Sequence, residues 1–161
     1  MKLAFTALLL AAMPLAGHAR EHVTIASSIP YASNAIGNAE VRAECDWNGK
    51  LSSYITTYAR GEVTATDQDL STIPGEVLVI HIDRVHVAGG GGFSGPKWAI
   101  IRGELKDHGR VINSFRMRRV SDRLFGFSAC GVLDHLAKAL GSDVARWVAS
   151  GHPDQIEADE R

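Results

Sequence analysis

Residues 76–88 read EVLVIHIDRVHVA. The segment Val77–Ile80 is apolar at four consecutive positions, which is typical of a strand inside a sheet that is covered on at least one side. The triplet at residues 73–75, Ile-Pro-Gly, predicts a turn before this strand, and the glycines at residues 89–92 interrupt it. The stretch therefore predicts a central strand that organises the fold.

Two further strands follow the glycines. Trp98, Ile100 and Ile101 mark a strand over residues 97–105, and residues 111–120 alternate well enough to return as its antiparallel partner. The segment Asp107-His108-Gly109 between them predicts a hairpin turn.

Two amphipathic helices flank these strands. The first is predicted to begin near residues 48–49 and end before Gly61, because its apolar residues recur at spacings of three and four: Trp47, Leu51, Tyr54, Ile55 and Tyr58. The second begins after Ser128, a plausible N-cap, and Gly141 inside it predicts a bend or a break into two shorter helices. Its apolar stripe comprises Val132, Leu133, Leu136, Ala137, Leu140, Val144, Trp147 and Val148.

The remaining segments give weaker signals. Residues 62–66 predict a short strand, and residues 20–38 read as a strand or an irregular lead-in. We expect one α+β domain over residues 20–161, with an antiparallel sheet of about four or five strands, two helices on one face and a frayed tail after Pro153.

The first nineteen residues have the pattern of a cleaved secretory signal. Lys2 precedes an apolar run over residues 3–16, and Gly17-His18-Ala19 offers small residues for signal peptidase. A membrane anchor is the alternative, but Pro14 interrupts the run, which is shorter than the roughly 20 residues that span a bilayer. We expect a mature chain of 161 − 19 = 142 residues in the periplasm or outside the cell.

The charge of the mature chain points to no nucleic-acid or membrane partner. Removing Lys2 leaves 16 basic and 18 acidic side chains, a formal net charge of −2. Such a balance provides no global attraction to nucleic acid or to an anionic membrane, so any charge-driven binding must come from a local patch.

The two cysteines, Cys45 and Cys130, predict an intramolecular disulfide in an exported chain. A redox-active or metal-binding pair is the alternative. It is disfavoured because there is no C-x-x-C spacing and no histidine adjacent to either cysteine.

The glycine run is a candidate partner surface, comprising Gly90, Gly91, Gly92, Phe93 and Lys97. A phosphate-binding loop is the alternative for these glycines. Such a loop should open a helix and be followed by the Lys and Ser/Thr of its motif, whereas a strand is expected here.

The basic stretch Arg116, Arg118, Arg119 and Arg123 forms a second candidate site. Arg116 and Arg118 share one side of their strand, and Arg84 and Arg102 would join them if the three strands are neighbours. The planar guanidinium group suits carboxylate and phosphate ligands, so this patch is a candidate anion site. An ordinary solvated surface is the alternative interpretation.

Metal-dependent and hydrolytic chemistry receive little support. In a regular strand, His81 and Asp83 share a face while His86 lies on the other, so the three cannot converge on a metal without a bulge. Ser94, His108 and His135 belong to no recognisable hydrolase motif. We predict no metal or other cofactor, and an enzyme is the less favoured interpretation.

Several segments together resemble a group of uncharacterised exported proteobacterial proteins. They are the run GGGFSGPK at residues 90–97, Gly103–Lys106, Ser114-Phe115, Cys130, Leu140–Asp143 and Trp147. The resemblance implies export and no particular activity.

The sequence predicts an exported, non-catalytic protein that binds another envelope protein or assists envelope assembly. Binding of an anionic small molecule or glycan at the arginines is the alternative, and an unrecognised hydrolase comes third. The sequence does not define an oligomeric state.

Overall fold

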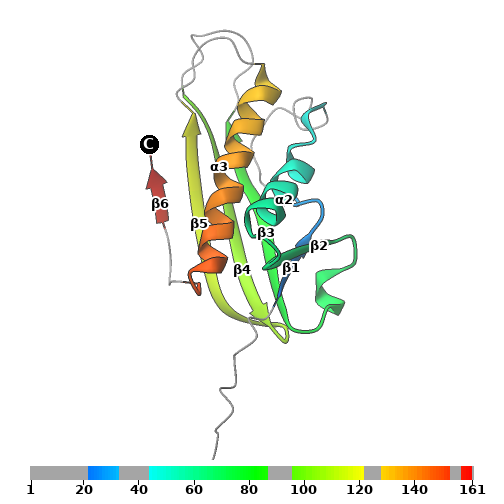
Figure 1. Ribbon diagram of the computed structural model, residues 1–161. Helices are drawn as coiled ribbons and strands as arrows, with labels where there is room; N and C mark the ends of the chain where they lie inside the picture. The colour runs from blue at the N-terminus through cyan, green and yellow to red at the C-terminus, as the bar shows by residue number, and fades with distance from the viewer. Residues whose placement is uncertain (1–21, 33–43, 87–95, 122–127, 153–156, 161) are drawn as a thin grey trace, which may run out of the picture.

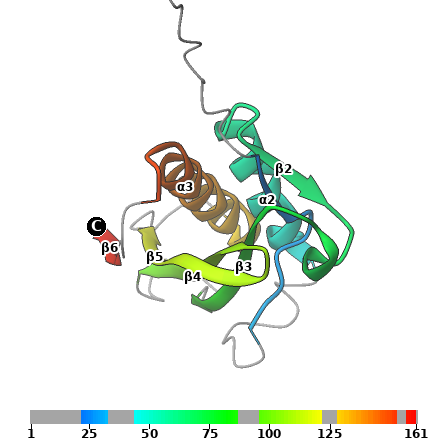
Figure 2. The ribbon, with the colours of Figure 1, turned by 90° about the horizontal axis from the view of Figure 1, so that it is seen from below.

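The computed structural model describes residues 22–32, 44–86, 96–121 and 128–152, together with the backbone of residues 157–160. The expected signal segment and the glycine run lie outside these residues. The described chain has the predicted α+β fold, with two long helices on the same side of one sheet (Figures 1 and 2). The elements are β1 (Val23–Ala26), α2 (Trp47–Tyr58), β2 (Val63–Thr66), the 3-10 turn η1 (Leu70–Thr72), β3 (Glu76–His86), β4 (Lys97–Asp107), β5 (Arg110–Ser121), α3 (Ala129–Ala149) and β6 (Glu157–Glu160).

The sheet has six strands in the order β2-β1-β3-β4-β5-β6 and is mixed, which corrects the expectation of an antiparallel sheet. Strands β3, β4 and β5 form the expected antiparallel meander. Strand β1 runs parallel to both β2 and β3, and β6 runs parallel to β5. Parallel neighbours need a crossover connection, and α2 is the crossover between β1 and β2.

The turn between β4 and β5 has the predicted position and a clear geometric reason. His108 and Gly109 both adopt positive φ angles, 48° and 78°. Two consecutive residues of this kind form the tight turn whose twist matches that of a hairpin. This turn pairs Asp107 with Arg110, and the register of β5 against β4 then shifts by one residue between Leu105 and Lys106.

A disulfide and a hydrogen bond join the two helices near their amino-terminal ends. Cys45 and Cys130 are bonded as predicted, and the bond closes a loop with a sequence separation of 85. Cross-linking a loop of that size stabilises a fold by about 4.5 kcal/mol in the chain-entropy view. The indole Nε1 of Trp47 donates to the Leu133 carbonyl at 2.5 Å, and the ring is fully buried. Ser128 caps α3 as predicted, because its hydroxyl accepts from the Gly131 amide.

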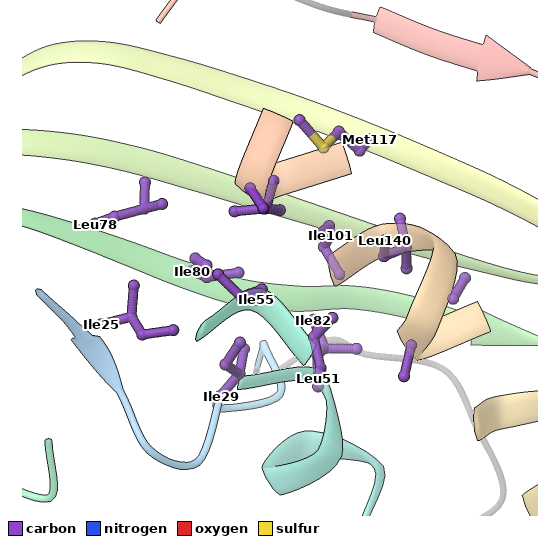
Figure 3. Close-up of a cluster of buried hydrophobic side chains, with 14 of the residues drawn as sticks. Ile25, Ile29, Leu51, Ile55, Leu78, Ile80, Ile82, Ile101, Met117 and Leu140 are labelled. Carbon is purple, nitrogen blue, oxygen red and sulfur yellow. The ribbon is translucent and has the colours of Figure 1, made fainter. Parts of the chain in front are cut away.

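The hydrophobic core lies between the helices and the face of the sheet that they cover. In Figure 3, Ile82 and Ile101 from the sheet lie beside Leu51 of α2 and Leu140 of α3. Along β4 the side that faces the helices is covered at Ala99, Ile101, Gly103 and Leu105, and on the other side Ile100 is also buried.

Gly141 allows α2 and α3 to pack closely, and it neither bends nor breaks α3, which is continuous from Ala129 to Ala149. A methyl group added at Gly141 would lie 2.7 Å from Cβ of Tyr54 and 3.1 Å from the backbone nitrogen of Ile55. Glycine therefore occupies this position because the backbone of α2 leaves no room for a side chain.

We expect Gly141→Ala to destabilise the protein by ~1–3 kcal/mol, because the overlap with α2 forces the helices apart. Alanine is the better helix former by about 1 kcal/mol, so helix propensity alone predicts the opposite sign. Urea unfolding of both proteins distinguishes the two effects. His135→Ala, at an exposed position of α3, is the matched control and should change stability by less than about 0.5 kcal/mol. A more stable Gly141→Ala protein would contradict the packing argument.

Candidate functional site: the arginine face

The face of the sheet opposite the helices carries the predicted arginine cluster. In Figure 2, α2 and α3 lie on one side of β3 and β4, and none of the described helices lies on the other side. We call the uncovered side the arginine face and define it by Arg84, Arg102, Arg116 and Arg118, which come from three neighbouring strands.

Strand register places these four arginines in two adjacent rows. Arg102 of β4 lies opposite Arg116 of β5. In the next row, Ile100 lies between Arg84 of β3 and Arg118 of β5. Directly opposed residues have Cβ atoms about 5 Å apart, and successive rows on one face are about 7 Å apart. A ligand with several anionic groups can therefore contact more than one guanidinium group at once.

A β-bulge at Asp83 brings Arg84 to this face. The pairing of β3 with β4 shifts between Ile82 and Arg84, so Asp83 is an additional residue in β3. In a regular strand Arg84 would share the covered face with Ile82. The bulge instead puts Val85 in the core and Arg84 opposite Ile100.

The same bulge changes the parity argument for His81, Asp83 and His86. His81 pairs with Arg102 and His86 with Trp98, so both histidines now belong to the arginine face. The bulge that convergence requires is present, yet no group of three metal-ligand side chains forms among the described residues. His81 and His86 lie in the rows of Arg102 and Trp98, which are four residues apart along β4, while Asp83 forms an ion pair with Arg102 and His86 stacks on Trp98.

Trp98 lies at the centre of one end of the arginine face. Its ring stacks with that of His86 at a centroid distance of 5.6 Å, and the guanidinium carbon of Arg118 lies 5.7 Å from the ring centroid. Cation–π contacts of this kind restrict an arginine without consuming its hydrogen-bond donors. From the sequence, Trp98 was predicted only to lie in a strand. Its contacts with His86 and Arg118 depend on the register of three strands, which the sequence does not reveal.

Ion pairs between described side chains lie on this face. Arg102 Nε lies 3.1 Å from an Asp83 oxygen, and Arg102 retains 54% side-chain exposure. Glu104, in the row beyond, pairs with Lys106 at 3.4 Å. Exposed ion pairs of this kind, such as that of Arg102 with Asp83, are weak enough to exchange with a ligand.

Arg119 has a structural role on the other side of β5. Its Nε and Nη2 atoms donate to the two carboxylate oxygens of Asp143 at 2.6 and 2.7 Å. Asp143 is buried in α3 and also lies 3.5 Å from Arg146. This bidentate pair attaches the last helix to β5.

The candidate partner surface predicted around the glycine run is only partly described. Gly90, Gly91, Gly92 and Phe93 lie outside the described residues. Lys97, the first residue of β4, is 9% exposed and counts among the buried residues. It pairs with Ser121 on the helix side of the sheet, which removes it from an exposed partner surface.

Other candidate sites show no assembled chemistry. An open groove of about 580 Å³ lies between the ends of α2 and α3 and includes Tyr58, Arg60 and Arg146. His108 contacts Asp107 in the exposed β4–β5 turn, and His135 is exposed on α3.

Within the described residues, no helix has both the length and the apolar character needed to cross a membrane.

The acidic carboxyl-terminal segment lies beside the basic strand β5. Residues Glu157–Glu160 form β6, which corrects the expectation of a frayed tail after Pro153 for these residues. The register aligns Glu157 with Arg116, Ala158 with Met117, Asp159 with Arg118 and Glu160 with Arg119. The sequence Glu-Ala-Asp-Glu has no apolar alternation, so nothing in it marked a strand.

The comparisons with known proteins identify solved structures with a similar fold. No protein-family model matches the chain, and no curated protein matches it. Two crystal structures of PelC dodecamers from Paraburkholderia phytofirmans have a similar fold. For a PelC variant the TM-score is 0.54 with 17% identity over 80% of this chain and 88% of that one. For the second crystal form the values are 0.52, 17%, 83% and 92%. A likeness at this identity shows a shared fold.

His152 connects α3 to the carboxyl-terminal segment. Its amide donates to the Trp147 carbonyl at 3.2 Å, and its carbonyl accepts from the side-chain amide of Asn113 on β5. The imidazole packs edge-on against Trp147 at 4.8 Å, and its Nε2 atom is buried without a hydrogen-bond partner among the described residues. Burial lowers the pKa of His152, and the negative charge of Glu76 opposes that shift.

We expect acid to destabilise the protein through His152. Because the folded state lowers its pKa, the unfolded chain binds a proton more readily. Stability from this group is therefore complete above the unfolded pKa of about 6.5 and falls as the pH drops toward the folded pKa. Thermal unfolding between pH 7.5 and 5 should show a smaller loss for His152→Gln than for the native chain. His135→Gln, at an exposed site, should retain the native pH dependence, and equal slopes for all three proteins would contradict the assignment.

Proposed function

We propose that this chain is an exported, non-catalytic binding protein of the cell envelope that binds an anionic partner through the arginine face. One observation supports this function above the others: three strands bring four arginines and Trp98 together on the sheet face opposite the helices. Guanidinium groups form forked, charge-assisted hydrogen bonds with carboxylates and phosphates. The signal-like start of the chain and the disulfide support the proposed export and the periplasmic or extracellular location.

We expect the variant Arg102→Ala/Arg116→Ala to weaken polyanion binding by ~5- to 30-fold, because each exposed charge contact contributes about 0.5–1 kcal/mol. The two probes are poly-L-glutamate and polygalacturonate, whose binding to the oxidised chain is measured by calorimetry at several salt concentrations. Added salt should weaken the binding, since it screens exposed charges.

The matched control removes two charges from the helix layer. Lys50→Ala/Lys138→Ala has the same net charge as the arginine variant, and both lysines lie on the helices. It should bind like the native chain. Binding of either polymer with loss only in the arginine variant supports the function. Binding of neither polymer, or equal loss in both variants, overturns it.

Self-association is a second candidate property, favoured by two observations. The similar solved structures are of dodecamers. Val111 and Ile112 are 55% and 52% exposed beside the β4–β5 turn, which makes them a candidate contact between copies. Because this chain shares its fold with PelC, we include self-association of this chain in the proposal.

We expect light scattering after gel filtration to give a mass several times that of one chain at micromolar concentrations. Val111→Ser/Ile112→Ser should shift the protein toward the monomer, because it removes the apolar contact. Tyr58→Ser, at an exposed aromatic residue near the α2–α3 groove, is the control and should retain the native mass. A monomer at every concentration up to about 100 µM would exclude stable self-association in the micromolar range.

A further inference from the structure

We infer that the anionic partner is an acidic, extended peptide segment that pairs as a strand with the outer edge of β5, where this chain's own acidic strand β6 now lies. This inference rests on the proposed function of the arginine face and specifies its partner and its mode of binding. The partner would be an envelope protein with an exposed acidic segment.

The first argument is the register between β5 and β6. Glu157 and Asp159 hold the register positions of Arg116 and Arg118, both of which belong to the arginine face. Ala158 holds the position of Met117, which is buried on the helix side. Over residues 157–159, acidic residues thus alternate with a small residue in step with Arg116, Met117 and Arg118, and Glu160 follows at the position of Arg119. A short peptide with this alternation matches the edge in both backbone pairing and charge.

The second argument is the small extent of β6. It has four residues, whereas β5 has twelve, and the two strands pair only over Arg116–Arg119. The pairing is parallel, which is slightly less stable per residue than antiparallel pairing. A strand this short at a sheet edge is weakly held, so a longer acidic peptide with the same pattern would replace it.

The third argument is where β6 sits in the chain. Four residues, 153–156, separate it from His152, whose carbonyl accepts the bond from Asn113 on β5. The tail therefore begins next to the edge that it occupies, and a short tether gives an effective concentration of ~1 mM. Such a tail excludes weak acidic ligands and yields to stronger ones, which makes β6 an internal competitor for the site.

The test compares the full chain with a chain that ends at His152. The probe is a fluorescein-labelled peptide of residues 153–161, PDQIEADER, and its binding is followed by anisotropy. With a dissociation constant of ~0.1 mM for the peptide, competition by the attached tail predicts about tenfold tighter binding to the shortened chain. A peptide carrying Glu157→Gln, Asp159→Asn and Glu160→Gln should bind at least fivefold more weakly.

A full-length variant guards against misfolding of the shortened chain. Glu157→Ala/Asp159→Ala/Glu160→Ala retains the tail but removes its three acidic side chains, and it should bind the peptide more tightly than the native chain does. Equal affinity of the peptide for the native chain, this variant and the shortened chain would overturn the inference.

Hydrogen exchange separates strand pairing from attraction by charge alone. In the shortened chain, the amides of Arg116–Arg119 that face the edge should exchange faster, and the peptide should restore their protection. If polygalacturonate binds through Arg102 and Arg116 while the peptide neither binds nor protects these amides, the proposed function stands and this inference fails. If neither ligand binds, both fail.

Discussion

The packing of α2 and α3 into one layer determines what the rest of the molecule can do. The layer is held by the Cys45–Cys130 disulfide, by the bond from Trp47 to the Leu133 carbonyl and by the close approach at Gly141. Because both helices lie on the same side, the apolar side chains of the meander are buried from that side. The opposite side of the sheet then carries polar and charged groups without disturbing the core.

Local patterns predicted the elements that depend on local physics. The apolar spacing of Trp47 to Tyr58, the cap at Ser128 and the turn at His108-Gly109 each involve residues close in sequence, and each lies where expected. Gly141 shows the limit of this approach. Its cost to a helix can be read from one segment, but its reason is the backbone of another helix 86 positions away at Ile55.

The candidate site was predictable in composition and less so in geometry. The arginine cluster was identifiable because Arg116 and Arg118 are two residues apart in β5 and therefore lie on the same face. Arg84 reaches the same face only because the extra residue at Asp83 reverses the parity of β3, and a bulge has no reliable sequence signal. Strand β2 lies where the sequence predicts it. The parallel pairing of β1, the strand character of β1 and the tail strand β6 were missed or left open for a related reason. Their backbone pairing is with segments distant in sequence, and their own residues show little periodicity.

The span of the disulfide couples folding to the compartment in which the chain resides. Cys45 precedes α2 and Cys130 lies in the first turn of α3, so the bond encloses most of the sheet and persists only in an oxidising environment. A reduced chain lacks about 4.5 kcal/mol of stabilisation, and an ordinary domain has only ~5–15 kcal/mol in total. The reduced chain is thus nearer to its unfolded state, and oxidation of the two thiols is the step that makes unfolding rare.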